Sequence, residues 1–220
     1  MPVSASTSRL EAFSDGVIAV IITIMVLELK VPYKNGLAGF RAVLPTLLVY
    51  LLSFAFTAIY WINHHHLVDR IEVVDPWILY ANLFFLFSLS LLPFFTSWVL
   101  EKGIDPFSVF LYAISLMVTG FGFLLLRLAI DRRLREHGTL PRESAAEQRK
   151  HIVSIVLYLV AIPLAFHYPR IALADLAIVT LIWIQPTAPL QPILDAKFAA
   201  RANARSLGGA SNTASPQEPS

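Results

Sequence analysis

One long apolar run, Arg9–Leu29, constrains this chain more than any other stretch. Positions 17–27 are apolar except for Thr23, and a helix over the whole run is about 32 Å long. That length is enough to cross the hydrocarbon core of a bilayer. The run nevertheless carries Ser14 and Asp15 near its N-terminal end. A carboxylate inside a membrane helix is costly, so its presence there needs a reason, either a satisfied polar contact within the structure or a role in gating or proton transfer.

Composition extends this interpretation to the whole chain. The sequence is 56% hydrophobic, against about 45–50% apolar residues in soluble domains. Only 15% of its residues are charged, against about 25% in soluble domains, and this combination is typical of a multi-pass membrane protein. The net charge of +2 gives no support for nucleic-acid binding. The absence of cysteine excludes disulfides and thiolate metal sites.

Six membrane-spanning helices are predicted from the apolar segments and from the signals at their ends. Ser8 is the expected N-cap of the first helix, and Asp-Pro pairs at 75–76 and 105–106 mark the starts of the third and fourth. Pro93 is expected to kink the third helix. The predicted helices cover residues 9–29, 42–63, 76–100, 106–131, 151–167 and 170–184.

The chain is expected to consist of one membrane domain with two short flanks. Residues 1–7 form a short N-terminal segment, residues 8–202 a six-helix transmembrane domain, and residues 203–220 a disordered cytoplasmic tail. With six spans, twelve Lys and Arg residues fall on the side of both termini and five on the other. The positive-inside rule therefore predicts cytoplasmic termini in a multi-pass protein of the cell (inner) membrane.

One face of the first helix carries a stripe at positions i, i+3, i+4 and i+7, namely Val20, Thr23, Ile24 and Leu27. Such a stripe either packs against another helix or lines a pore, in which Val20 and Leu27 would be hydrophobic constrictions. One helix cannot surround an axis, so the pore interpretation requires a homo-oligomer, for which a closed tetramer is natural. The chain lacks the carbonyl filter sequence of ordinary potassium channels.

Two motifs in this chain resemble a known family. Arg9, Phe13, Ser14, Asp15 and Gly16 match an R-x-x-x-F-S-D-G signature at the head of a first membrane helix. The later stretch Trp61-x-x-His64-His65 resembles a W-x-x-H-H stretch of the same family. This is the bacterial branch of a potassium-channel family named after its lysosomal animal member, transmembrane protein 175.

The resemblance implies a function and a set of pore residues. It implies passive potassium conduction by a homotetramer of six-helix subunits whose first helix lines the central pore. It also places the narrowest apolar ring three positions before a threonine, which corresponds to Val20 here. Potassium is then the permeating ion, no cofactor is expected, and the partners are further copies of the chain and the lipid bilayer.

Asp15 is expected to face the helix bundle, because it lies about 140° around the helix from Val20. Trp61, the histidines that follow it, or Arg9 of a neighbouring subunit are the candidate partners of this carboxylate. Adjacent histidines point to different sides of a helix, and no H-E-x-x-H spacing occurs, so no metal site is predicted.

Two other classes of function remain as alternatives. A secondary ion-coupled transporter would use Asp15 and Asp175 as coupling carboxylates, although no inverted repeat is evident. A membrane-embedded enzyme would use the histidine triplet at 64–66, but the sequence shows no second ligand cluster and no nucleophile constellation. The chain is therefore not expected to be an enzyme.

Overall fold

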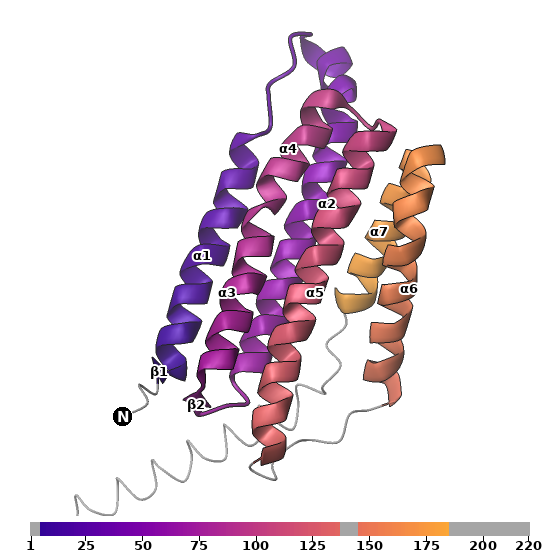
Figure 1. Ribbon diagram of the computed structural model, residues 1–220. Coiled ribbons are helices and arrows are strands. Elements are labelled where there is room, and N and C mark those ends of the chain that lie inside the picture. The colour runs from indigo at the N-terminus through magenta and orange to yellow at the C-terminus, as the bar shows by residue number, and fades with distance from the viewer. Residues whose placement is uncertain (1–4, 137–144, 185–220) are drawn as a thin grey trace, which may run out of the picture. The chain divides into compact units, whose positions relative to one another are not determined.

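The computed structural model describes residues 5–136 and 145–184, and these residues are nearly all helical (Figure 1). The described residues form six helical rods, and the third rod is broken into two helices. The all-α prediction is therefore confirmed. In chain order the elements are β1 (Ala5–Ser6), α1 (Thr7–Leu27), α2 (Gly36–Val68), β2 (Val73–Val74), α3 (Pro76–Ser90), α4 (Leu92–Lys102), α5 (Pro106–Glu136), α6 (Ala145–His167) and α7 (Pro169–Ile184).

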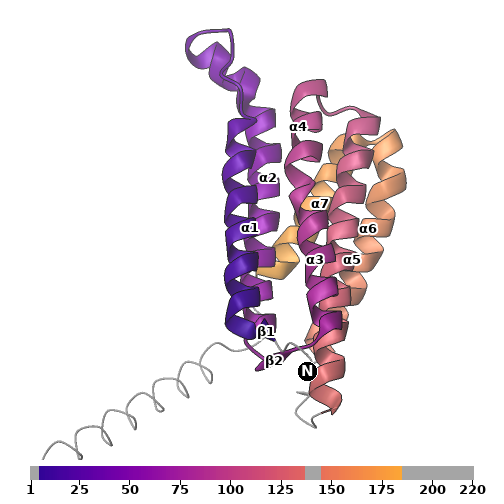
Figure 2. The ribbon, with the colours of Figure 1, turned by 60° about the vertical axis from the view of Figure 1, so that its left-hand side comes forward.

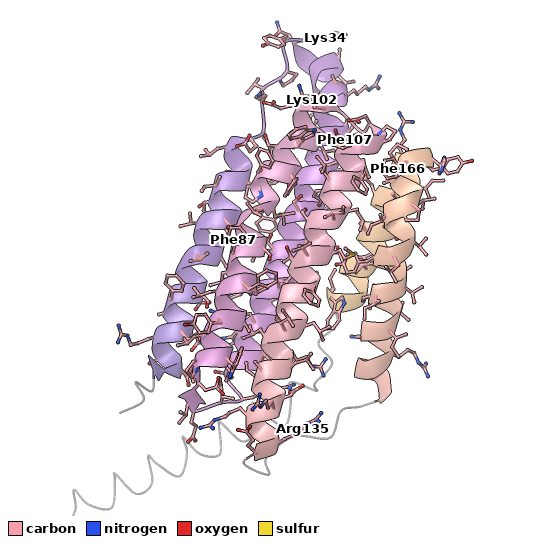
Figure 3. The ribbon with its side chains drawn as sticks, viewed as in Figure 1. Lys34, Phe87, Lys102, Phe107, Arg135 and Phe166 are labelled. Carbon is pink, nitrogen blue, oxygen red and sulfur yellow. The ribbon has the colours of Figure 1, made fainter. Side chains whose placement is uncertain are left out.

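Four of the rods in the described part of the chain have the length and composition of membrane spans. Among the described residues, four segments are long and apolar enough to cross a bilayer: Thr7–Leu27, Gly36–Val68, Pro76–Lys102 and Pro106–Glu136. The shorter apolar stretch of α6 is Ile152–His167, and α7 has 16 residues. Large apolar side chains such as Phe87 and Phe166 lie on the outer surface of the bundle (Figure 3), as expected where lipid is the solvent. The chain is a multi-pass membrane protein.

Helix α5 lies centrally and α1 lies at an edge of the bundle. Helix α5 packs against α3, α4, α6 and α7, whereas α1 packs mainly against α2 and α3. The two views place α1 and α6 on different sides of α5 (Figure 2). The centre is filled by fully buried side chains of α3 and α5, among them Phe85, Tyr112, Leu116 and Leu126. One face of α1 is therefore left without a neighbour in the single chain.

Both Asp-Pro pairs begin helices as predicted. The Asp75 carboxylate accepts a hydrogen bond from the Ile78 backbone N–H at 2.9 Å, at the start of α3. Asp105 accepts from the backbone N–H groups of Phe107 at 3.0 Å and Ser108 at 3.3 Å, at the start of α5. The Ser108 hydroxyl also donates to Asp105, and these donors lower the pKa of its carboxyl.

A kink was expected at Pro93, and the structure has a break of the third rod beside it. Helix α3 ends at Ser90 and α4 begins at Leu92. Pro93 has no N–H to donate to the carbonyl oxygen four residues earlier. The chain instead continues through a hydrogen bond from the Phe95 N–H to the Leu91 carbonyl oxygen at 3.2 Å. The break leaves two shorter helices in one span.

Helix α2 is longer than predicted at both ends, and this corrects the placement of the histidine triplet. The triplet lies in the last turns of α2 and does not follow the helix. The polar character of the triplet suggested a loop, but His64 is fully buried and its ring stacks on Phe85 at a centroid distance of 5.8 Å. The helix ends where the Asp69 N–H donates to the His65 carbonyl oxygen at 3.0 Å.

The start of α1 also differs from the expectation. The helix begins at Thr7, so Ser8 lies inside the helix and is not its N-cap. β1 forms an antiparallel pair with β2, with Ala5 opposite Val74 and Ser6 opposite Val73. The Thr7 hydroxyl lies 3.1 Å from the Ile71 carbonyl oxygen and 2.9 Å from that of Glu72. These contacts tie the start of α1 to the turn between α2 and α3. The predicted tail at 203–220 lies outside the described residues.

Candidate functional site

Helix α1 has two distinct faces. Its buried face consists of Leu10, Ser14, Ile18, Ile21 and Met25, which pack toward α2 and α3. The predicted stripe lies on the other side of the helix and is exposed. The exposed fractions are 55% for Val20, 43% for Ile24 and 78% for Leu27, and Thr23 is exposed as well. The structure therefore brings all four stripe residues onto one free face of α1.

The polar atom of this stripe has a defined orientation. The Thr23 hydroxyl oxygen lies 3.0 Å from the Ala19 carbonyl oxygen and 2.9 Å from the Val20 carbonyl oxygen. The hydroxyl hydrogen is thus donated back to the helix, as is common for threonine within helices. The oxygen keeps lone pairs that can accept a hydrogen bond or contact a cation.

A groove runs beside the stripe, between α1 and the broken rod of α3 and α4. Its volume is about 780 Å³. Its walls are mostly apolar, with Val17 and Val20 on α1 and Pro93 and Phe94 on the broken rod. The break at Pro93 therefore lies directly opposite the exposed part of α1.

Three buried polar side chains join α1, α2 and α3. Asn82 on α3 donates from Nδ2 to the Ser14 hydroxyl oxygen on α1 at 3.0 Å, and the Ser14 hydroxyl donates to the Leu10 carbonyl oxygen at 2.8 Å. The Asn82 Oδ1 lies 2.8 Å from His64 Nε2 on α2, so Nε2 carries a proton and donates it. Ser14, Asn82 and His64 are each at most 2% exposed. In this series of hydrogen bonds, each buried polar side chain is the partner of the next.

The other ring nitrogen of His64 favours the neutral form of the imidazole. Within the described part of the chain, Nδ1 is buried and has no hydrogen-bond partner. A proton on Nδ1 would be a buried donor without an acceptor, which is costly. The tautomer with its proton on Nε2 satisfies Asn82 and avoids that cost. In this arrangement His64 is a hydrogen-bond donor to Asn82.

Asp15 pairs with Trp61, one of the three kinds of partner considered from the sequence. The indole N–H of Trp61 on α2 donates to Asp15 Oδ1 at 2.8 Å. The donor is neutral, so this contact is a charge-assisted hydrogen bond and not an ion pair. Asp15 is partly buried at the α1–α2 junction. It faces α2 and not the exposed stripe.

His65 lies between two carboxylates at the same end of the bundle. Its Nδ1 is 2.7 Å from Glu11 Oε1 on α1, and its Nε2 is 3.8 Å from Asp69 Oδ2. These three residues hold one ligand atom each within 4.8 Å of one another, so they could in principle hold a metal ion. The carboxylates engage opposite ring nitrogens, however, which suits a hydrogen-bonded clamp better than one shared ion. The expectation of no metal stays a prediction.

Sequence reasoning missed Glu11 as the partner of His65. The available signal was the spacing of Glu11 and Asp15 at i and i+4, which places both carboxylates on one side of α1. Arg9 and Phe13 of the signature lie elsewhere, on exposed positions of α1. The structure of one chain therefore joins only part of the predicted motif network.

Asp175 lies apart from these contacts, in α7, which packs chiefly against α6. Its Oδ2 is buried and has no hydrogen-bond partner among the described residues. Lys30 forms an ion pair with Glu101 and not with Asp175. Asp15 and Asp175 thus belong to separate local environments.

Comparison with known proteins shows the family of this chain. Residues 9–93 match the family described as endosomal/lysosomal potassium channel TMEM175. A protein of Chryseobacterium sp. (strain P1-3), named a potassium channel, is 41% identical over 186 residues, covering 84% of this chain and 96% of that protein. The chain belongs to the TMEM175 family. The resemblance inferred from the sequence is confirmed.

A second relative and a solved structure are similar to this chain over more residues than the family match covers. A protein of Chamaesiphon minutus, named a potassium channel, is 32% identical and covers 75% of this chain and 87% of its own length. A crystal structure described as a lysosomal potassium-selective channel TMEM175 homolog from Chamaesiphon minutus superimposes with a TM-score of 0.60. It shares 27% sequence identity and covers 81% of this chain and 96% of that chain. These TMEM175 relatives are named as ion channels and not as enzymes.

The contacts of Ser14 with Asn82 and of Asp15 with Trp61 hold α1 against α2 and α3, and we call them the polar anchor of α1. The family match covers this whole anchor. The match begins at Arg9 and ends at Pro93. It therefore contains the contacts of Ser14 with Asn82 and of Asp15 with Trp61. The contacts that hold α1 in place therefore lie within the residues that match the family.

Proposed function

We propose that this chain is one subunit of a potassium channel, which passes potassium passively through a pore lined by α1. The observation that carries the proposal is the free face of α1, where Val20, Thr23, Ile24 and Leu27 are all exposed at the edge of the bundle. The names of the TMEM175 relatives support potassium as the permeating ion. No cofactor is needed for passive conduction.

The stripe suits a hydrophobically constricted pore. Rings of Val20 and Leu27 around an axis would exclude water when they are narrow, and ions cannot cross a dry apolar ring cheaply. Thr23 lies between these two levels, with its oxygen lone pairs free of the helix backbone. A ring of such oxygens can replace part of the hydration shell of a potassium ion.

Assembly into a homotetramer is part of the same proposal. One α1 cannot enclose an axis, and rotational symmetry brings identical copies of one helix together. The apolar groove of about 780 Å³ beside α1 gives a neighbouring subunit a surface on which to pack. Phe13 is exposed and lines the same groove, so it would belong to this packing surface.

The polar anchor sets the rotation of α1. Asn82 and Trp61 hold Ser14 and Asp15 on the side of the helix that faces α2 and α3. The ladder of β1 and β2 fixes the start of the same helix. With that side held, the stripe is turned away from the bundle, toward the proposed axis.

Orientation and location follow from charge. The ends of the bundle are distinct, with Lys34 and Lys102 at one end and Arg135 at the other (Figure 3). The twelve-to-five distribution of Lys and Arg favours cytoplasmic termini and the cell (inner) membrane. Residues 8–202 then form the channel domain, and 203–220 a cytoplasmic tail.

Potassium flux into liposomes tests this function. Purified full-length protein in liposomes should carry potassium down its own gradient when no other ion gradient is present, and protein-free liposomes should not. A coupled transporter, with Asp15 and Asp175 as coupling carboxylates, would move potassium uphill when a proton or sodium gradient is imposed. Flux that depends on such a second gradient would replace the channel proposal by the transporter.

A further inference from the structure

A second hollow lies inside the bundle, away from α1. Its volume is about 380 Å³, and α2, α5, α6 and α7 all contribute to its walls. The α2 residues that line it run from Phe56 to Asn63, which places it in the half of the bundle that contains the α2–α3 turn. This volume falls within the usual range of about 300–1,000 Å³ for small-molecule pockets.

The walls combine a large apolar surface with a few polar groups. None of the lining residues is Lys, Arg, His, Asp or Glu. The Tyr60 and Tyr158 hydroxyls form a hydrogen bond with each other. The Trp183 indole N–H donates to the Ser154 hydroxyl oxygen at 2.8 Å, and Ser154 is only 5% exposed. The Ser154 hydroxyl, which accepts in this contact, still has its own proton to donate.

Glycine at position 120 keeps the wall thin beside the tyrosine pair. A Cβ at this position would lie 3.1 Å from the Tyr60 hydroxyl oxygen and 3.6 Å from the Tyr158 ring. A side chain at this position would therefore crowd the Tyr60 hydroxyl. The rim is formed by Phe121, Ile155 and Leu159, which are 54%, 50% and 60% exposed. Because these residues lie on membrane helices, the opening faces the apolar surroundings of the bundle.

We propose that this cavity is a binding site for a neutral, compact and mostly apolar molecule with one hydrogen-bonding group, such as a substituted phenol, which enters from the bilayer. A charged ligand is excluded because it would lose its hydration without gaining a partner in the wall. An apolar cavity of about 150 Å³ suffices to bind benzene in another protein, so the space here admits a ring with side branches.

The hydrogen-bonding group of the ligand is matched by the Ser154 hydroxyl. In an apolar site such a bond discriminates strongly, because a ligand without the group leaves a buried polar atom unsatisfied. The site is separate from the proposed pore face on α1. It stands whether or not the chain conducts potassium, because binding can be measured without flux.

The test uses 2,6-diisopropylphenol as the probe and 1,3-diisopropylbenzene as its partner without the hydroxyl. Binding to the folded protein should raise the melting temperature of the purified full-length chain in a saturable way. The phenol should bind about tenfold more tightly than the hydrocarbon, and Ser154→Ala should reduce that preference. Equal binding of the two compounds to the parent protein would overturn the assignment of the hydrogen-bonding group.

Matched variants locate the site. Ile155→Trp should fill the mouth of the cavity and abolish the shift, whereas Ile152→Trp, on the same helix but outside the lining, should leave it unchanged. Leu159→Phe is a milder block of the same rim if the tryptophan variant does not fold. A full shift in a folded rim variant would place the probe elsewhere and overturn the proposal. A shift of the same size produced by decane would indicate a lipid acyl chain as the occupant, and would overturn it too.

Discussion

His64 on α2 and Asn82 on α3 face each other inside the bundle, with Nε2 of the histidine 2.8 Å from Oδ1 of the amide. The same amide donates to Ser14 on α1, so one side chain links three helices. Neither of the residues it joins is more than 2% exposed. Loss of this link should therefore destabilise the packing of α1, α2 and α3 together.

Replacing Asn82 with alanine removes both hydrogen bonds of its side chain. The His64 Nε2–H loses its acceptor in a buried setting, and an unsatisfied buried group costs about 1–3 kcal/mol. The melting temperature in detergent should fall clearly. Asn63→Ala is the control, because the Asn63 amide donates within α2, to the Ile59 carbonyl oxygen. Equal melting of the two variants would remove Asn82 from the account of how α1 is held.

Variants of Asp15 separate its charge from its role as an acceptor. Asn retains an oxygen that can accept from Trp61, so Asp15→Asn should cost no more than about 1 kcal/mol of stability. Asp15→Ala should cost more, because the indole N–H loses its partner. Combining Asp15→Ala with Trp61→Phe should then be less harmful than the sum of the single effects. Strict additivity of the two changes in thermal unfolding would show that the contact contributes nothing.

Orientation can be read from single cysteines, because the chain has none of its own. Arg135 and Lys102 lie at opposite ends of the bundle (Figure 3). Arg135→Cys should resist an impermeant thiol reagent in intact cells, and Lys102→Cys should react with it. The reverse labelling pattern would show that the protein has the opposite orientation in the membrane. It would contradict the orientation inferred from the distribution of Lys and Arg.

Thr23→Val removes a hydroxyl from the stripe while keeping the branched shape. If the oxygen of Thr23 contacts a partly dehydrated ion, the preference for potassium over sodium should weaken severalfold in reversal-potential measurements. Thr46→Val on α2 is the matched control, because its hydroxyl donates to the Val43 carbonyl oxygen away from the stripe. Unchanged reversal potentials in the Thr23 variant would exclude this hydroxyl from selectivity.

The elements that the sequence predicted well are those set by local chemistry. The Asp-Pro starts of α3 and α5 and the break at Pro93 depend on neighbouring residues, and the structure has all three. The stripe on α1 followed from helical periodicity alone, because its positions share one face of any helix. Whether that face lines a pore depends on other copies of the chain.

Contacts between distant segments could not be predicted in the same way. Pairing of His64 with Asn82 depends on how α2 and α3 are rotated about their own axes, which their apolar sequences leave open. The ladder of β1 and β2 involves two residues on each side, too few for a periodic signal. The cavity beside Tyr60 depends on the separation of four helices, a property that no single segment encodes.

Val20 tests the central claim, because it is expected to form the dry ring that limits conduction. Val20→Asn places four amides at that level, so hydration becomes easier and potassium flux into liposomes should rise. Val26→Asn is the control, since Val26 is similarly exposed on α1, at 46%, but lies off the stripe. The account predicts higher flux for Val20→Asn than for both the parent and Val26→Asn, with unchanged assembly. Unchanged flux together with poorer assembly would show that Val20 faces protein or lipid, and would contradict a pore lined by α1.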